Sequence, residues 1–184
     1  MAVSAEEFRN ALRCWASGVS IVTTRHDDGI RGITVSSFCS LSLDPPLILI
    51  CIARNARSHE LIARQKAFAV NILGAGQRRL SDRAAGRLGE EGTRLEGLPH
   101  RTAVTGAPIL EDAIAWLDCA LVDRHPGGDH TIFVGRVEAA GAGAGRPLLY
   151  CRSSYRKLAP PTARSKRHVA RPKPRPRRRS RSRT

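Results

Sequence analysis

The feature that most constrains the fold is a series of short apolar, β-branched runs separated by turn residues. Val, Ile, Thr and aromatic residues suit a pleated, half-buried surface, whereas Gly, Pro and Asp favour turns. The runs predict strands at residues 20–25, 30–37, 47–53, 68–73, 113–125, 130–140 and 148–151. Most of them follow one another as hairpins, so the pattern predicts a mainly β chain: a largely antiparallel barrel with peripheral helices.

Helical spacing marks the segments outside these runs. Ser4 and Glu7 form a capping box, and the apolar residues that follow, Phe8, Leu12 and Trp15 among them, predict a helix over 5–16 whose apolar stripe packs on the body. A second helix is expected at 59–65 with Ser58 as its N-cap, and a third ends near residue 86. The run 47–53 is continuously apolar, which predicts a strand buried on both faces.

Charge divides the chain into two parts. The formal net charge is +15, but residues 161–184 contain 11 Lys/Arg and no Asp or Glu, which leaves 20 bases against 16 acids before them. We therefore expect one domain at 1–158 and a disordered basic Arg/Pro/Ser-rich tail at 159–184. Such a tail attracts polyanions non-specifically, and nucleic-acid binding through it is one alternative function. A recently acquired extension without a function is another reading of the tail.

The expected localisation depends on two features that the sequence does not show, a signal peptide and a membrane-spanning segment. The N-terminus does not resemble a signal peptide, and the apolar run 47–53 is too short to cross a bilayer. The five cysteines are odd in number and none has CxxC spacing, so neither a disulfide framework nor a zinc site is indicated. Four of them lie beside apolar residues, which predicts small core side chains. We expect a cytoplasmic protein without a membrane span or a bound metal.

The stretch Gly32–Pro46, GITVSSFCSLSLDPP, begins as a strand and then becomes rich in hydroxyls. Hydroxyls cost free energy when they are buried without a partner, so a core has little use for five of them in nine residues. A segment that contacts a polar ligand can use all of these hydroxyls as hydrogen-bond partners. A Ser-rich loop, in which hydroxyls bond the nearby backbone, explains the composition equally well.

A second candidate site follows the apolar run 47–53. Arg54 and Arg57 flank Asn55 just before the expected helix. Guanidinium groups and the free N–H groups of a helix start both favour phosphate, so the segment can bind an anion. A solvated loop before a capped helix explains the same residues equally well.

With these residues in view, the body of the chain resembles the flavin reductase family, the short reductase components of two-component monooxygenases. The resemblance covers about residues 8–158. It is carried by five segments in the family's order: FRNALRCWASGVSIVTT, GITVSSFCSLSLDPPLILICIARNARS, FAVNIL, GDHTIFVGRV and PLLYCRSSYRKL.

The resemblance implies an antiparallel Greek-key split β-barrel, the FMN-binding split barrel, that forms a homodimer. It also implies reduction of FMN or FAD by NADH or NADPH, with a flavin-dependent monooxygenase as partner. An alternative keeps the barrel but gives it tightly bound FMN that acts on another substrate. The purified protein separates the two, because only the first is colourless and oxidises NADH when flavin is added.

The resemblance also assigns site residues. It implies flavin contacts from two segments: Thr34, Val35, Ser36, Ser37, and then Cys51, Ile52, Ala53, Arg54, Asn55, Ala56, Arg57, Ser58. Alternation along an extended chain adds Ser40, on the same face as Ser36. The motif DHTIFVGRV places the catalytic His130 on the nicotinamide side, and Tyr155 falls near the ring system. Without the resemblance, His130 would be interpreted as a residue at the start of a strand whose side chain forms hydrogen bonds with the neighbouring backbone.

Overall fold

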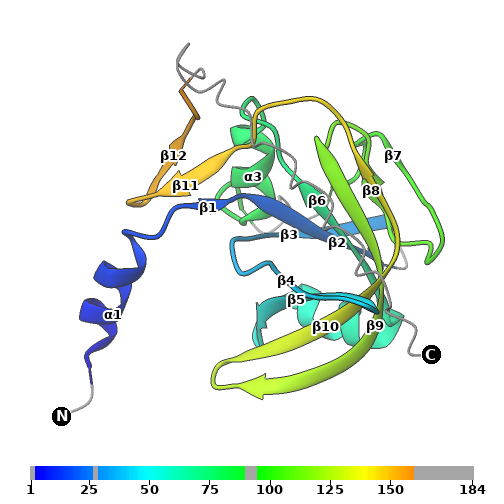
Figure 1. Cartoon of the computed structure of the whole chain (residues 1–184), viewed down its shortest axis with the longest axis horizontal. Helices are drawn as coiled ribbons and strands as arrows, with labels where there is room; N and C mark the ends of the chain where they lie inside the picture. Colours follow the sequence, from blue (N-terminus) through cyan, green and yellow to red (C-terminus); the bar gives the residue numbers. More distant parts are fainter. Residues whose placement is uncertain (1–2, 27–28, 90–94, 160–184) are drawn as a thin grey trace, which may run out of the picture.

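The computed structural model describes residues 3–26, 29–89 and 95–159, which form one mainly β unit with helices at its margins (Figure 1). Its helices are α1 (Ala5–Leu12), α2 (Arg57–Gln65) and α3 (Arg78–Ala84). Its strands are β1 (Ser17–Gly18), β2 (Ser20–His26), β3 (Gly29–Val35), β4 (Cys39–Leu43), β5 (Pro46–Ala53), β6 (Ala67–Ile72), β7 (His100–Arg101), β8 (Ile109–Leu110), β9 (Ala115–Gly127), β10 (His130–Ala142), β11 (Leu149–Cys151) and β12 (Ser154–Arg156). The basic tail lies outside the described residues.

Seven strands form the main sheet in the order β3-β2-β6-β9-β10-β5-β4, and every pairing is antiparallel. The long hairpin β9–β10 and strand β6 lie between the hairpins β2–β3 and β4–β5, so the two hairpins supply the two edges. The sheet curves around its core (Figure 1), and within the described ranges its edge strands β3 and β4 are not paired with each other. The expected mainly β, antiparallel fold is confirmed.

The core inside the curved sheet is built from the strands' inward-facing residues. Phe68, Phe133 and Ile50 are fully buried there, and helix α2 contributes Ile62 to the same cluster. The core leaves no room for a side chain at position 135 of β10, because a Cβ atom on Gly135 would lie 2.6 Å from Phe68 Cζ. The helix α2 is therefore held by the core, and its first turn is fixed at the end of β5.

A second cluster joins α3 to the other side of the hairpin β2–β3. Buried Ile21, Leu73 and Leu95 form it, and the tyrosines of the hairpin β11–β12 pack against it. Arg152 and Ser153 form the two-residue turn of this hairpin with φ values of 51° and 56°. Two positive φ values in succession suit the right-handed twist of a short hairpin. The turn places Tyr150 directly across from Tyr155.

Helix α1 differs from its prediction. It ends at Leu12, four residues early, and none of its residues is buried. Phe8, Leu12 and Trp15 are 55%, 53% and 74% exposed, and α1 projects from the body near the N-terminal end (Figure 1). The capping box of Ser4 and Glu7 is confirmed. The prediction that the apolar stripe packs on the body is wrong, because no residue of α1 is buried against the rest of its own chain.

Two further predictions about the strands are corrected. Strand β5 is not buried on both faces: Ile48, Ile50 and Ile52 are buried and the residues between them are half-buried. The hydroxyl-rich segment before it contains the edge strand β4, which the sequence did not predict. The break expected at Asp44–Pro46 is limited to Asp44 and Pro45, because β4 ends at Leu43 and β5 begins at Pro46. The peptide bond between Asp44 and Pro45 is cis.

The prediction for the cysteines, that four of them are small core side chains, is also corrected. All five are free, and only Cys119 is buried. Burial raises the pKa of the Cys119 thiol to about 12, so it is a core side chain and not a reactive one. Cys14 and Cys39 are exposed, and Cys51 and Cys151 are half-buried.

None of the helices in the described ranges has the length and apolar character needed to cross a membrane.

Candidate functional site

Three adjoining clefts lie where the predicted segments meet. The first, the tyrosine cleft, has a volume of about 180 Å³ and is lined by residues that include Thr34, Val35, Ser36, Tyr150 and Tyr155. The second, the helix-start cleft, has a volume of about 410 Å³ and is lined by residues that include Thr34, Asn55, Ala56, Arg57 and Ser58. Thr34 and Ala85 line both, so the two clefts adjoin at the end of β3.

The third, the α1 cleft, has a volume of about 470 Å³ and lies between the end of α1 and the hairpin β11–β12. Ser36 and Tyr150 line both this cleft and the tyrosine cleft. Ligand sites in proteins commonly measure about 300–1,000 Å³. The helix-start cleft and the α1 cleft each fall within this range, which suits a small-molecule ligand.

The end of β3 is positioned by hydrogen bonds on both sides. Thr34 Oγ1 donates to the carbonyl of Ser81 in α3 over 2.7 Å. Ser37 Oγ donates to the carbonyl of Cys51 over 2.8 Å and accepts from the Cys51 N–H over 3.2 Å. These bonds fix the chain from Thr34 to Ser37 between α3 and β5. The exposed Ser36 lies between them and faces two clefts.

The start of α2 opens into the helix-start cleft. Its N-cap is Ala56, which makes no side-chain hydrogen bond, so the prediction of Ser58 as N-cap is wrong. An alanine side chain cannot accept a hydrogen bond from the first turn, and the His59 N–H donates instead to the Ala56 carbonyl over 2.9 Å. The helix start therefore has no side-chain cap that would compete with an anion. Arg57, the first helical residue, lines the same cleft beside buried Ser58. A helix start without a side-chain cap is better suited to bind a phosphate than a helix start that a side chain already caps.

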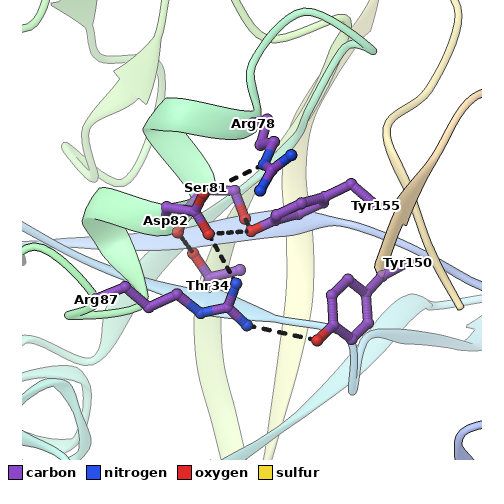
Figure 2. A network of polar contacts seen from close by, with 7 residues as sticks. All are labelled: Thr34, Arg78, Ser81, Asp82, Arg87, Tyr150 and Tyr155. Atoms are coloured by element: carbon purple, nitrogen blue, oxygen red, sulfur yellow. Dashed lines mark hydrogen bonds and ion pairs between the residues drawn. The ribbon is translucent and has the colours of Figure 1, made fainter. Parts of the chain in front are cut away.

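A polar network forms the wall between α3 and the last hairpin (Figure 2). The Tyr155 hydroxyl donates to Asp82 Oδ1 over 2.8 Å and lies 2.9 Å from Ser81 Oγ. Asp82 also forms ion pairs with Arg87, at 2.8 Å, and with Arg78, at 3.5 Å. Burial alone would raise the pKa of Asp82, but the hydrogen bonds from Tyr155 and Arg87 and the two arginine charges lower it.

The same network fixes the tyrosine rings. The rings of Tyr150 and Tyr155 meet edge to face with centroids 5.4 Å apart, and the guanidinium of Arg78 lies 5.2 Å from the Tyr155 ring centroid. Burial, which outweighs the opposing hydrogen bond with Ser81, raises the pKa of Tyr155. The hydroxyl therefore stays protonated and able to donate.

His130 lies at the start of β10, outside the three clefts. Its Nδ1 is 2.6 Å from Oδ1 of the adjacent Asp129. This hydrogen bond and the charge of His130 lower the pKa of the Asp129 carboxyl. His130 pairs with Ala53, and the Arg54 N–H donates to the Asp129 carbonyl over 3.0 Å. The histidine thus stands beside the turn that leads into the helix-start cleft.

The structure therefore brings together many, but not all, of the predicted site residues. Those that line the clefts are Thr34, Val35, Ser36, Ser37, Asn55, Ala56, Arg57, Ser58 and Tyr155. Those that lie elsewhere are Ser40 on the exposed edge strand β4, Cys51, Ile52 and Ala53 within β5, Arg54 in the following turn, and His130.

Sequence reasoning missed several lining residues, among them Ser81, Ala85, Arg87 and Tyr150. One signal could have revealed Tyr150. It stands five positions before Tyr155, with Arg152 and Ser153 centred between them. A two-residue turn at that centre makes the two tyrosines cross-strand partners.

Residues 12–159 match the family described as the flavin reductase like domain. Among curated proteins, an NADH-dependent flavin reductase from Rhodococcus is 39% identical over 153 residues, which cover 82% of this chain and 84% of that protein. The flavin-dependent monooxygenase reductase subunit HsaB of Mycobacterium tuberculosis is 36% identical over 156 residues, covering 83% and 82%.

Solved structures give the same result. The NADH:FAD oxidoreductase SgcE6 of Streptomyces globisporus, in complex with NAD and FAD fragments, superposes with a TM-score of 0.78 at 32% identity and covers 87% of this chain and 98% of that one. The styrene monooxygenase flavin reductase of Pseudomonas putida gives 0.73 at 31% identity, covering 84% and 99%. The chain belongs to the flavin reductase-like family.

Proposed function

We propose that the protein is an NADH:flavin oxidoreductase that binds FMN or FAD as a dissociable substrate in the joined clefts and releases it reduced. The observation that carries this is the start of α2, which has no side-chain cap and opens with Arg57 into a cleft that adjoins the tyrosine cleft. The curated relatives include proteins named as NADH-dependent flavin and FMN reductases. The flavin accepts the hydride from the nicotinamide; the protein binds and orients the two rings.

The helix-start cleft would hold the flavin phosphate. The first-turn N–H groups of α2 have no side-chain acceptor, and the Arg57 side chain adds a positive charge at the same point. A helix start and a guanidinium group together favour a phosphate over a neutral group. The phosphate is thus the end of the flavin that the chain fixes most firmly.

The segment Thr34–Ser37 would line the polar edge and ribityl chain of the flavin. Thr34 donates to Ser81 and Ser37 is bonded to Cys51, so the segment is already rigid before a ligand binds. Ser36, which faces both neighbouring clefts, is the hydroxyl in this segment best placed to contact the ligand. A rigid segment loses little freedom on binding, which favours correct orientation of the rings.

His130 would contact the nicotinamide substrate. Asp129 holds its Nδ1, which leaves Nε2 to point away from that carboxylate. Because the histidine lies beside the turn before the helix-start cleft and not inside the cleft, it can meet a second molecule without displacing the flavin. Its proposed role is to position the nicotinamide.

Two copies of the chain would form a homodimer. Helix α1 presents Phe8, Leu12 and Trp15 to solvent, and the edge strand β4 presents Leu41 and Leu43, which are 50% and 93% exposed. Apolar patches of this kind mark interaction sites. Leu12→Asp should shift the mass in analytical ultracentrifugation from dimer to monomer, while Leu88→Asp, at an exposed leucine on another surface, should not.

The reduced flavin would pass to a flavin-dependent oxygenase. Curated relatives are named as reductase components of monooxygenases, among them a 4-nitrophenol monooxygenase reductase of Rhodococcus opacus. The basic tail would add weak, salt-dependent attraction to polyanions. Deletion of residues 160–184 should reduce retention on heparin and leave flavin reduction unchanged.

The purified protein tests the dissociable-flavin proposal. We expect it to be colourless and to oxidise NADH only after free flavin is added. A yellow protein that retains its flavin through gel filtration, and whose rate does not rise with added flavin, would instead favour a tightly bound prosthetic group.

A further inference from the structure

Two cysteines far apart in the sequence meet beside the clefts. Cys14 follows helix α1 and Cys151 ends β11, and the pairing of β1 with β11 brings these segments together. The Arg152 N–H donates to the carbonyl of Arg13 over 2.8 Å. Cys151 Sγ lies 3.8 Å from that same carbonyl oxygen and 4.0 Å from the carbonyl oxygen of Cys14. We propose that Cys14 and Cys151 form a reversible disulfide when the protein meets hydrogen peroxide.

The backbone contact between Arg13 and Arg152 holds the two cysteines close together, because each cysteine is next to one of the hydrogen-bonded residues. The Cys14 thiol points back toward the Asn10 carbonyl, 3.9 Å away, so the bond would require the Cys14 side chain to change its rotamer. A disulfide needs Cα atoms within about 7 Å. Any remaining adjustment falls on the segment at the end of α1, a helix with no residue buried within its own chain, so a small movement there leaves the core of the protomer intact.

The other cysteines are placed differently. Cys119 is buried and its raised pKa keeps it a thiol. Cys39 is exposed on β4 and its thiol faces the carbonyl of the adjacent Ser40. Cys51 is half-buried within β5, and burial raises its pKa. The pair of Cys14 and Cys151 thus combines access to peroxide with a second thiol nearby.

The chemistry balances with hydrogen peroxide as the oxidant. The Cys14 thiol loses its proton, the resulting thiolate attacks one peroxide oxygen, and the O–O bond breaks. Cys14 becomes a sulfenic acid, and the hydroxide that leaves takes up the thiol proton to give one water. The Cys151 thiol then attacks that sulfur, the S–S bond forms, and the sulfenic oxygen leaves as a second water. Two thiols and one peroxide give one disulfide and two waters. Free reduced flavin reacts with dioxygen to form peroxide, so the oxidant would arise where the enzyme works.

The bond would act on the reductase site, a consequence that rests on the proposed function. The α1 cleft is lined by Arg13, Trp15 and Cys151 and shares Ser36 and Tyr150 with the tyrosine cleft. A disulfide would fix the end of α1 against β11 and restrict the entrance that these residues share. Oxidation should therefore slow flavin reduction when peroxide accumulates, and thiols should reverse the effect.

Peptide mapping tests bond formation without reference to activity. The full-length protein is treated with hydrogen peroxide, alkylated and digested with trypsin without reduction. The expected product joins residues 14–25 to residues 137–152, is two hydrogen atoms lighter than the two peptides together, and disappears after dithiothreitol. Recovery of both cysteines as unlinked thiols or as sulfinic acids would overturn the proposal. A disulfide-linked dimer on a non-reducing gel, in place of a linked monomer, would also overturn it.

Two serine variants complete the test. Cys14→Ser should abolish the linked peptide, whereas Cys39→Ser, at another exposed cysteine, should leave it intact. In the wild type, peroxide should lower the rate of NADH oxidation roughly three-fold or more, because an element fixed beside the site slows binding and release. The rate of Cys14→Ser should be insensitive to the same treatment. A linked wild type whose rate does not change would show that the disulfide forms but does not regulate.

Discussion

The hydroxyl of Tyr155 donates a hydrogen bond of 2.8 Å to the carboxylate of Asp82, which ties the last hairpin to helix α3. Tyr155→Phe removes this bond and the contact with Ser81, so we expect a loss of about 1 kcal/mol in the free energy of unfolding. Tyr150→Phe is the matched control, because that hydroxyl has only a 3.4 Å contact with Arg87. Equal losses in the two variants, measured by urea denaturation, would contradict the assigned role of Tyr155.

The same carboxylate makes a prediction about acid stability. The folded-state pKa of Asp82 is lower than its ordinary value of 3.8, so its ionised form stabilises the fold above that pH. This stabilisation is lost as the pH falls through the folded-state pKa. Asp82→Asn should therefore be less stable than the wild type at neutral pH, and the difference should shrink toward pH 3. A difference that stays constant in urea titrations across this range would contradict the prediction.

Arg57 should discriminate between flavins by their phosphate. Arg57→Ala removes a charged hydrogen-bond donor, so we expect FMN to bind more weakly by about 1.5–3 kcal/mol, roughly ten- to a hundred-fold in Kd. Riboflavin, which lacks the phosphate, should bind nearly as before. Arg64→Ala, in the last turn of the same helix, is the control and should change neither value. If FMN and riboflavin weaken alike in fluorescence titrations of Arg57→Ala, then Arg57 does not contact the phosphate.

His130 should affect the nicotinamide substrate alone. His130→Ala is expected to raise the KM for NADH about five-fold, the cost of one hydrogen bond, with the KM for flavin unchanged. His125→Ala, on the opposite strand of the same hairpin, should leave both constants unchanged. An equal rise in the KM for flavin would place the histidine in the flavin site instead.

Gly135 should be required for packing. A methyl group there would lie 2.6 Å from Phe68 Cζ and 3.0 Å from Cys119 Cβ, so Gly135→Ala should cost about 1–3 kcal/mol of stability through overpacking. Gly18→Ala is the control, because no atom lies within 4 Å of the added methyl group. Similar thermal midpoints for the two variants would contradict the described packing.

The strands were predictable because their limits depend on local turn chemistry. The predicted strands 20–25, 68–73 and 130–140 match β2, β6 and β10 to within two residues at every end. Strand β4 was missed because its run of Ser and Leu has no β-branched residue and read as a hydroxyl-rich loop. The packing predicted for α1 failed because helical spacing shows that a stripe is apolar but not which surface covers it.

The candidate site was predictable where its residues are close in sequence. Thr34, Val35 and Ser36 were identified as one segment, and the segment from Asn55 to Ser58 as another. The part contributed by Ser81 and Tyr150 depends on how α3 and the last hairpin pack against β3, which no local pattern encodes. The uncapped start of α2 is a related case: Ser58 is a favourable N-cap by type, but the helix begins one residue before it.

Steady-state oxidation of NADH by the purified full-length protein, with FMN, FAD, riboflavin or no flavin added, tests the central claim most directly. The account predicts negligible oxidation without flavin, saturable oxidation with at least one of FMN and FAD, and loss of the preference for FMN over riboflavin in Arg57→Ala. NADH oxidation that does not depend on added flavin, or its absence with all three flavins, would contradict it.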